Sequence, residues 1–238
     1  MPQPKKTLFL LDAYALIFRA FYAFINSRML NSNGVNTAPI FGFVLAMEEV
    51  IRNQKPTHIA VVFDPPGGSF RNGMYEKYKA NREETPEPIK VAVPWIKKII
   101  QAFNIPVIEV SGFEADDVIA TLARLAEEKD FLTYMMTPDK DFNQLVTENI
   151  LVFKPAKSGA DPEIIGVNEV KTKFGIDEPS QFIDILALMG DSADNVPGAP
   201  GIGEKGRHQT PLPLRLSGSR TLQPGISYQC GNGTAADR

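Results

Sequence analysis

The stretch 112–141 reads GFEADDVIATLARLAEEKDFLTYMMTPDKD and predicts a helix followed by a strand. After the acids of EADD at 114–117, apolar residues recur about every 3.6 positions, which is typical of an amphipathic helix. The run FLTYMM at 131–136 is apolar, aromatic and of strand length, and a second acidic group, DKD, follows at 139–141. The two groups place five carboxylates beside apolar segments, a pattern that suits a hard cation better than a hydrophobic core.

Each acidic group also has a simpler structural explanation. Acids in the first turn of a helix complement its dipole and cap free N–H groups, and an Asx turn or N-cap would explain one of Asp139 and Asp141. Three acids in one turn, Glu114, Asp116 and Asp117, repel one another and exceed what a cap requires. The second group follows a strand, and open α/β sheets bind ligands at the carboxyl ends of their strands. We therefore favour a functional role for both groups.

Two earlier apolar strands also end in an aspartate. Thr7–Leu11 is followed by Asp12, and His58–Phe63 is followed by Asp64. A lone Asp12 is explained equally well as the cap of the helix that follows it. Parallel α/β packing, however, brings the carboxyl ends of such strands to one edge of the sheet. Oxygen ligands without Cys or His favour Mg²⁺ or Mn²⁺ over zinc, and two such ions about 4 Å apart promote phosphodiester cleavage.

The remaining hydrophobic patterns complete an α/β fold with a parallel sheet. We expect an edge strand at 163–165, and we expect Pro94 to kink the helix at 89–103 or to mark its start. Further strands are expected at 106–110 and 150–153, and further helices at 14–23, from Pro39 to before Pro56, and at 142–146, 168–174 and 179–188.

The segment 70–82 reads FRNGMYEKYKANR and interleaves cations with tyrosines. A solvated helix face would explain any one of these Lys and Arg residues. Beside an acidic metal site, however, such a segment supplies positive charge for phosphate oxygens and rings for an unpaired base. The candidates are Lys79, Arg82 and Arg71 as catalytic cations, and Tyr75 and Tyr78 as stacking rings.

Two further segments carry candidate nucleic-acid contacts. In the helix at 14–23 most rings are expected in the core, but Arg19 and Tyr22 could present a cation and a stacking face. Asp191 and Asp194 precede the run Gly201-Ile-Gly203-Glu-Lys205, whose backbone N–H groups could bind a phosphate with added charge from Lys205. A Gly-x-Gly run alone is better explained as a plain loop, and the two acids strengthen the functional interpretation.

The composition sets wider limits. With 43% hydrophobic residues the chain can form a substantial core. A net charge of −3 argues against a uniformly basic nucleic-acid protein, although it allows a local basic face. Cys230 is the single cysteine and cannot form an internal disulfide, which favours a reducing compartment. Without a run of membrane-spanning length or a signal-peptide pattern, the chain is expected to be cytoplasmic.

In their order along the chain, these motifs resemble the 5′-nuclease domain of bacterial DNA polymerase I, within the 5′-to-3′ exonuclease and flap endonuclease superfamily. The resemblance covers about residues 5–205 and is specific, because whole blocks match in order. The blocks are Asp12 with Arg19-Ala and Tyr22-Ala; Val-Phe63-Asp64; Phe70-Arg71 to Tyr78-Lys79-Ala-Asn-Arg82; Glu114-Ala-Asp116-Asp117; Asp139-Lys-Asp141; and Gly190-Asp191 to Gly203-Glu-Lys205. Ala13 departs from the family, which often has glycine there.

The resemblance implies a fold and a set of site residues. It implies a PIN-like parallel core at 1–167 with a helical arch near 70–90, and the start of a helix-three-turn-helix DNA-binding module at 168–205. Arg71, Lys79 and Arg82 match arch residues that contact the scissile phosphate, and 201–205 matches a hairpin that grips downstream duplex. The implied ligands of two divalent ions, Mg²⁺ or Mn²⁺, are Asp12, Asp64, Glu114, Asp116, Asp117, Asp139, Asp141, Asp191 and Asp194.

The resemblance also implies an activity. Such enzymes hydrolyse DNA at 5′ flaps or nicked duplexes and remove RNA primers in replication and repair, so the expected partners are these DNA junctions. The protein is expected to be a monomer and not to bind a membrane.

The residues from Gly206 to Arg238 depart from this pattern. They lack lysine and a sustained helical period, and they are rich in arginine, proline and glycine. Our hypothesis is that residues 206–238 are translated from a shifted reading frame or form a disordered tail. The product would then lack the rest of the helix-three-turn-helix module and a polymerase domain. Reading the gene in its other two frames from the Gly206 codon tests the frameshift. If neither frame restores a helix that begins with Thr-Ala, the frameshift hypothesis fails.

Two other classes of protein share part of the pattern. Phosphatases and phospho-receiver domains also place Asp at strand ends, but a phosphatase needs a second acid two residues after Asp12, where Tyr14 stands. Neither class needs a basic arch. A DNA-binding remnant without catalysis is the stronger alternative, and binding of flap DNA without metal-dependent hydrolysis would favour it.

Overall fold

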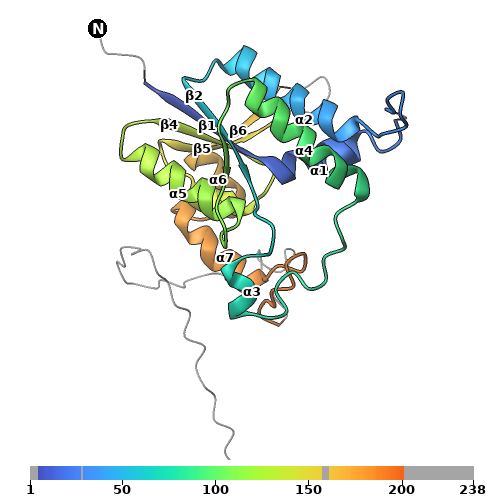
Figure 1. Cartoon of the computed structure of the whole chain (residues 1–238). Coiled ribbons are helices and arrows are strands. Elements are labelled where there is room, and N and C mark those ends of the chain that lie inside the picture. The colour runs from blue at the N-terminus through green and yellow to red at the C-terminus, as the bar shows by residue number, and fades with distance from the viewer. Residues whose placement is uncertain (1–4, 28, 157–160, 201–238) are drawn as a thin grey trace, which may run out of the picture.

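The computed structural model describes residues 5–27, 29–156 and 161–200 (Figure 1). Its centre is one six-stranded sheet in the order β3-β2-β1-β4-β5-β6. All neighbouring strands pair in parallel except the edge strand β6, which runs antiparallel to β5. The strands are β1 Thr7–Asp12, β2 His58–Phe63, β3 Val107–Glu109, β4 Leu132–Met136, β5 Ile150–Lys154 and β6 Glu163–Ile165.

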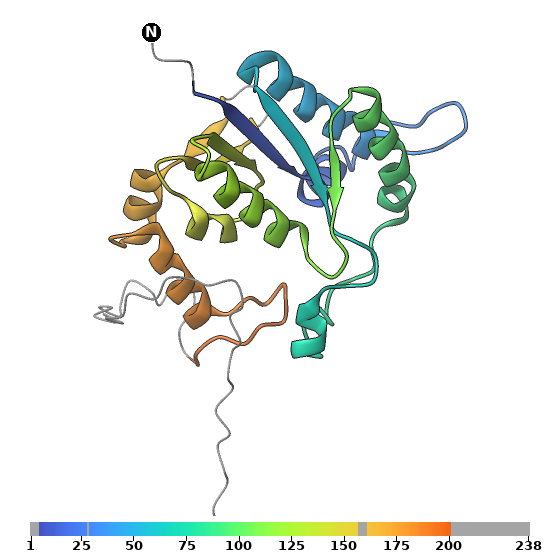
Figure 2. The ribbon, with the colours of Figure 1, turned by 60° about the vertical axis from the view of Figure 1, so that its left-hand side comes forward.

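Helices cover both faces of the sheet (Figures 1 and 2). Alternate residues of the central strand point to opposite faces, so Phe9 and Leu11 join one core cluster while Leu10 joins the other. The first cluster includes residues of α1 Ala13–Ala23, α2 Ala38–Glu49 and α4 Glu87–Ala102, and the second includes residues of α5 Ala115–Glu127. Burial on both faces explains why the central strands are continuous apolar runs.

The shorter elements complete the chain. A π-helical turn, Val50–Gln54, extends α2 and ends at Lys55, which has a left-handed φ of 45°. The 3₁₀ turns are Asp141–Leu145 and Pro179–Gln181, and the remaining helices are α3 Phe70–Met74, α6 Val167–Phe174 and α7 Phe182–Met189. Figure 2 shows α3 and the loop after α7 together at the same end of the sheet.

The predicted α/β fold with a mostly parallel sheet is confirmed. The structure differs at Pro94: α4 begins at Glu87 and runs through Pro94, which therefore does not mark its start. It differs also at the expected arch near 70–90, where Phe70–Met74 is helical, turns follow to residue 81, and the next helix, α4, begins only at Glu87. Asn72-Gly73 and the prolines at 86 and 88 disfavour a longer helix there.

Two other expectations concern the chain ends and membranes. In the described ranges no helix is long and apolar enough to cross a membrane. The expected hairpin at 201–205 and the tail at 206–238 lie outside the described residues.

Candidate active site

The carboxyl ends of three neighbouring strands bring three predicted acids to one edge of the sheet. Asp12 ends β1, Asp64 follows β2 and Asp139 follows β4, and β1 pairs with both other strands. The chain moves outward from β1 to β2 and β3, and then returns to β4 on the other side of β1. This reversal of strand order is the place where open α/β sheets form their ligand sites.

Asp12 is both a helix cap and a member of this group of acids. Its side chain is 5% exposed; one oxygen accepts a hydrogen bond from the Ala15 N–H at 3.2 Å, and the other accepts from the Thr137 hydroxyl at 2.9 Å. Burial raises the pKa of Asp12 to about 6; the two hydrogen bonds oppose the rise, and the charges of Asp64 and Asp139 add to it. Capping alone therefore does not account for this residue.

Asp116 joins the same group from the first turn of α5. Burial, with smaller contributions from the charges of Asp12, Asp139 and Asp64, raises its pKa to about 8. Asp64 is oriented toward this helix end, because its Oδ1 accepts a hydrogen bond from the Ala115 N–H at 2.9 Å. We name Asp12, Asp64, Asp116 and Asp139 the inner acids. Their mutual repulsion shows that the fold concentrates negative charge at one point.

A second group of acids adjoins the inner acids. Burial raises the pKa of Asp141 to about 6, with further contributions from the charges of Asp139 and Asp191. The Oδ1 atom of Asp141 is buried and has no hydrogen-bond partner among the described residues. Asp191 and Asp194 lie in the loop after α7, where Asp191 accepts hydrogen bonds from the Ala193 and Asp194 N–H groups at 2.7 and 3.3 Å. The Asp141 N–H donates to Asp139 at 2.9 Å, which is the expected Asx turn.

The predicted cations form ion pairs with the outer members of the acid set. Arg71 binds Asp117 through two N–H···O contacts of 2.7 Å and lies 3.7 Å from Glu114. Lys79 donates to Glu114 at 2.9 Å and lies 3.8 Å from Asp194, which also pairs with Arg82. We name Glu114, Asp117 and Asp194 the outer acids.

The ion pairs have opposite effects on the two partners' titration. Burial raises the pKa of Glu114, but Lys79 and the hydroxyls of Ser69 and Tyr78 outweigh burial, so this pKa lies below its ordinary value. The pKa of Arg71 is raised, mainly by its hydrogen bonds to Asp117. Both groups therefore remain charged at neutral pH.

Backbone contacts hold the basic segment against the loop after α7. The Lys79 N–H donates to the Asp194 carbonyl at 2.9 Å, and Lys79 has a left-handed φ of 57°. The side-chain amide of Asn81 donates to the Ser192 carbonyl, and that of Asn195 donates to the Lys77 carbonyl, both at 2.8 Å. The segment 70–82 thus bridges the start of α5 and the 191–196 loop.

The residues present fit divalent cations by charge and by donor type. All the donors are carboxylate oxygens, which Mg²⁺ and Mn²⁺ prefer, and the buried Asp141 oxygen lacks a partner among the described residues. Within the described ranges, no three Asp, Glu, His or Cys side chains already converge on one coordination position. The fit therefore rests on uncompensated charge and an orphaned oxygen.

The predicted nucleic-acid contacts lie in different settings. Tyr78 was expected to stack on a base, but it is 8% exposed and its ring is not accessible for stacking. Its hydroxyl lies 3.0 Å from Glu114 and 3.2 Å from Asp194. Tyr75 and Tyr22 are exposed. Arg19 donates to the carbonyls of Pro155 and Ala156 at 3.2 and 2.6 Å. Gly201, Gly203 and Lys205 lie outside the described residues.

Sequence reasoning missed two hydroxyls that support the acids. Thr137 donates to Asp12 and Ser69 donates to Glu114, both at 2.9 Å. Thr137 ends the apolar run before Asp139, and Ser69 begins a Ser-x-x-Asn cap, so their positions in the sequence offered a weak signal.

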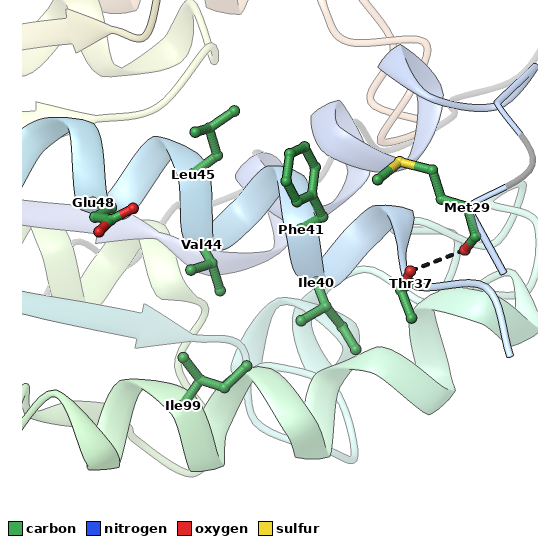
Figure 3. A pocket seen from close by; sticks show the side chains of 8 residues that line it. All are labelled: Met29, Thr37, Ile40, Phe41, Val44, Leu45, Glu48 and Ile99. Carbon is green, nitrogen blue, oxygen red and sulfur yellow. Dashed lines mark hydrogen bonds between the residues drawn. The ribbon is translucent and has the colours of Figure 1, made fainter. Parts of the chain in front are cut away.

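A hollow of about 380 Å³ lies elsewhere, between α2 and α4 (Figure 3). Its lining is mostly apolar and includes Ile40, Val44 and Ile99. Its one acid, Glu48, pairs with Arg52. The hollow lacks the grouped carboxylates of the sheet edge and does not suit the same chemistry.

Comparisons with known proteins agree with the geometry. Residues 7–175 match the family model described as 5′-3′ exonuclease, N-terminal resolvase-like domain. The chain is 39% identical over 201 residues to DNA polymerase I of Bacillus subtilis, and 41% identical over 200 residues to the 5′-3′ exonuclease of Aquifex aeolicus. Each match covers 84% of this chain, but 22% of the polymerase and 67% of the exonuclease. The chain thus spans about a fifth of the length of the polymerase.

A solved structure shows the same fold. The bacteriophage T5 D15 flap endonuclease, in a pseudo-enzyme-product complex with DNA and metal ions, aligns with a TM-score of 0.64 and 21% identity. The alignment covers 85% of this chain and 74% of the phage protein. Identity at this level establishes the shared fold alone.

Proposed function

This chain belongs to the 5′-3′ exonuclease and flap endonuclease family of nucleases, as its motifs predicted, and we propose that it hydrolyses phosphodiester bonds at 5′ flaps, nicks and RNA-primer junctions. The proposed cofactors are two divalent ions, Mg²⁺ or Mn²⁺. We also propose that the chain acts as the nuclease part of a DNA polymerase I, which is supported by its 39% sequence identity to the Bacillus subtilis protein. It also includes a nuclease core at 1–167, the start of a DNA-binding module at 168–205 and a separate tail.

The observation that carries the proposal is the concentration of charge at the inner acids. Four carboxylates from β1, from the ends of β2 and β4 and from α5 meet at a strand reversal, and the pKa values of Asp12 and Asp116 are raised. A fold that only needed helix caps would not place mutually repelling acids together. Perturbed acids grouped at a ligand-binding edge favour a catalytic cation site.

The inner acids and Asp141 would hold the cations, with Asp191 and Asp194 beside them. When bound, such cations lower the pKa of water and stabilise charge on the leaving oxygen. Glu114 and Asp117 belong to the proposed ligand set as well, but their carboxylates now bind Lys79 and Arg71. These two carboxylates would bind a metal cation after their ion pairs with Lys79 and Arg71 break.

The basic segment would orient the DNA. Lys79, Arg82 and Arg71 are held in place by the outer acids, so their charges are already at the edge of the cation site. A phosphate that enters there competes with a carboxylate for each cation and gains charge-assisted hydrogen bonds. Exchange of carboxylate for phosphate would place the scissile bond beside the inner acids without bringing new cations from a distance.

A cleavage assay with one charge-removing substitution of similar size tests the proposal. The full chain should cut a labelled 5′-flap duplex when Mg²⁺ is added and should not cut it in EDTA. Asp139→Asn removes one inner charge and should slow cleavage about 100- to 1,000-fold, because metal-dependent charge stabilisation is worth several kcal/mol. Asp130→Asn is the matched control, since Asp130 is exposed and its φ of 60° suits asparagine.

The outcomes separate the candidates. Rapid cleavage by Asp139→Asn would show that the proposed cation site is wrong. Flap binding by the wild-type chain without Mg²⁺-dependent cleavage would favour the DNA-binding remnant. Equal losses in Asp139→Asn and Asp130→Asn would mean that the effect is not specific to the inner acids.

A further inference from the structure

Two half-exposed phenylalanine rings lie together beside the candidate active site. Phe70 begins α3 and is 46% exposed, and Phe113 directly precedes Glu114 and is 48% exposed. Their ring centroids are 5.7 Å apart and their planes are inclined by 53°. Neither ring is part of the two core clusters. The pair therefore leaves apolar aromatic surface open to solvent at a place where the neighbouring side chains are ionic.

The backbone fixes the two rings relative to each other. The Phe70 N–H donates to the Gly112 carbonyl at 2.9 Å, and Ser69 and Gly112 form a parallel β-bridge. Gly112 has a φ of 81°, a conformation that favours glycine. The side chain of Ser69 also donates to Glu114 at 2.9 Å. These contacts tie the start of α3 to the start of α5, so the ring pair is prepared before any ligand binds.

The surroundings of the pair favour a polyanion that also carries flat rings. The Arg71 guanidinium lies 4.7 Å from the centre of the Phe70 ring while it binds Asp117. The segment 70–82 contains four cations and one acid. Aromatic faces beside cations bind single-stranded nucleic acid, because bases stack on the rings and phosphates pair with the charges.

We propose that Phe70 and Phe113 form a platform that stacks one unpaired nucleobase of the 5′ strand beside the inner acids. This inference rests on the proposed function and adds a base-binding subsite to it. Stacking there would hold the first unpaired nucleotide while Arg71 and Lys79 exchange their carboxylate partners for phosphate. The platform reads no sequence, because every base presents a π-face.

The rings have one competing explanation within the fold. Phe70 lies over Arg71, so the pair could serve only to shield the ion pair between Arg71 and Asp117 from water. Shielding would affect DNA binding to the same extent whether or not a base is present in the flap. Stacking would depend on the base itself. The two explanations therefore differ in a double-mutant cycle between a ring and a base.

The experiment measures binding of a fluorescent 5′-flap duplex to the full chain in EDTA by anisotropy. Intact flaps are compared with flaps that carry one abasic site, placed in turn at each of the first unpaired nucleotides. Phe113→Ala and Phe70→Ala should weaken binding of the intact flap about 5- to 100-fold. At one flap position the abasic site should weaken wild-type binding by a similar factor. The Phe→Ala substitution and the abasic site together should then weaken binding little more than either change alone.

Further variants keep the test interpretable. Phe113→Tyr retains a ring and should bind like the wild type, whereas Phe113→Leu retains apolar volume but should lose most of the base dependence. Phe103→Ala is the matched control, because Phe103 is 46% exposed but caps the end of α4 that leads into the amino end of β3, away from the carboxyl edge. It should bind both flaps like the wild type.

Each outcome has a clear meaning. Unchanged binding by Phe113→Ala, or equal losses on intact and abasic flaps at every position, would overturn the platform. Cleavage in Mg²⁺ is measured on the same substrates as a separate readout. Ring-to-base coupling without cleavage would overturn the proposed hydrolysis and keep the platform, whereas cleavage without coupling would do the reverse.

Discussion

Replacing Asp116 with asparagine should stabilise the cation-free protein at pH 8. Burial, together with the charges of Asp12, Asp139 and Asp64, raises the pKa of Asp116 from 3.8 to about 8. No hydrogen bond within the described residues involves the Asp116 carboxylate, so asparagine removes the charge without removing a bond. The variant thus relieves repulsion that the wild-type fold must contain.

The size of the effect follows from proton linkage. Because the folded-state pKa is raised, the protonated carboxyl contributes stability that is fully present below the unfolded pKa of 3.8 and is lost as pH rises through about 8. A shift of this size, from 3.8 to about 8, corresponds to a ceiling of about 6 kcal/mol at about 1.4 kcal/mol per pKa unit. Protonation of one inner acid also relieves its neighbours, so we expect a gain of about 1–3 kcal/mol for Asp116→Asn.

The assay is thermal unfolding of the wild type, Asp116→Asn and Asp130→Asn in EDTA at pH 5 and pH 8. At pH 8 the Asp116→Asn variant should melt about 2–12 °C higher than the wild type, at about 2–4 °C per kcal/mol for a chain of this size. At pH 5 the folded-state carboxyl is protonated while the unfolded one is mostly ionised, so the difference should shrink to about a third of its value at pH 8. Asp130→Asn should match the wild type at both pH values.

A cation should reverse the ranking. Mg²⁺ at about 100 times its Kd should stabilise the wild type by about 2.7 kcal/mol, and the variant should gain much less because it lacks one inner charge. If Asp116→Asn were less stable than the wild type at pH 8, or if the stability difference were the same at both pH values, the electrostatic account of the inner acids would be refuted.

Two further predictions concern the basic segment and the helix packing. Lys79→Ala removes the cation that binds Glu114, and single-turnover cleavage should fall about 100- to 1,000-fold, whereas Lys77→Ala, at an exposed position in the same segment, should lose less than about 10-fold. Similar losses in both variants would mean that only the total charge of the segment matters. Gly42→Ala should cost about 1–3 kcal/mol in urea unfolding, because its new Cβ would lie 2.6 Å from the Ala20 Cβ where α1 packs on α2. Gly73→Ala, whose Cβ meets nothing within 4 Å, should be neutral, and a neutral Gly42→Ala would contradict the close helix packing.

The inner acids were predictable from the sequence because they depend on topology alone. Each follows an apolar strand or begins the amphipathic helix, and parallel strands have their carboxyl ends at one edge. The partners of the outer acids were not predictable in the same way. Arg71 and Asp117 are separated by 46 positions, and their contact depends on how the chain between β2 and α3 returns to Gly112. No periodic pattern encodes that return.

Tyr78 shows the same limit within one segment. Its neighbours Lys77 and Lys79 suggested an exposed ring, yet the structure buries it. The cause lies far away in the sequence, because its hydroxyl meets both Glu114 and Asp194. Burial raises the pKa of Tyr78, and the two carboxylates raise it further. The hydroxyl thus stays protonated at neutral pH and can donate a hydrogen bond to either carboxylate.

The distribution of cations over the two groups of acids explains why one group remains available for metal ions. Arg71 binds Asp117, Lys79 binds Glu114 and Arg82 binds Asp194. The pKa of Glu114 is lowered accordingly. The pKa values of Asp12, Asp116 and Asp141 are raised instead, which means that the described part of the chain does not supply these acids with enough positive charge. A chain that neutralised all its acids would fold with less repulsion but would have no affinity left for a cation. The outer ion pairs therefore stabilise the edge of the site, while the uncompensated inner charge provides the driving force for binding cations from solution.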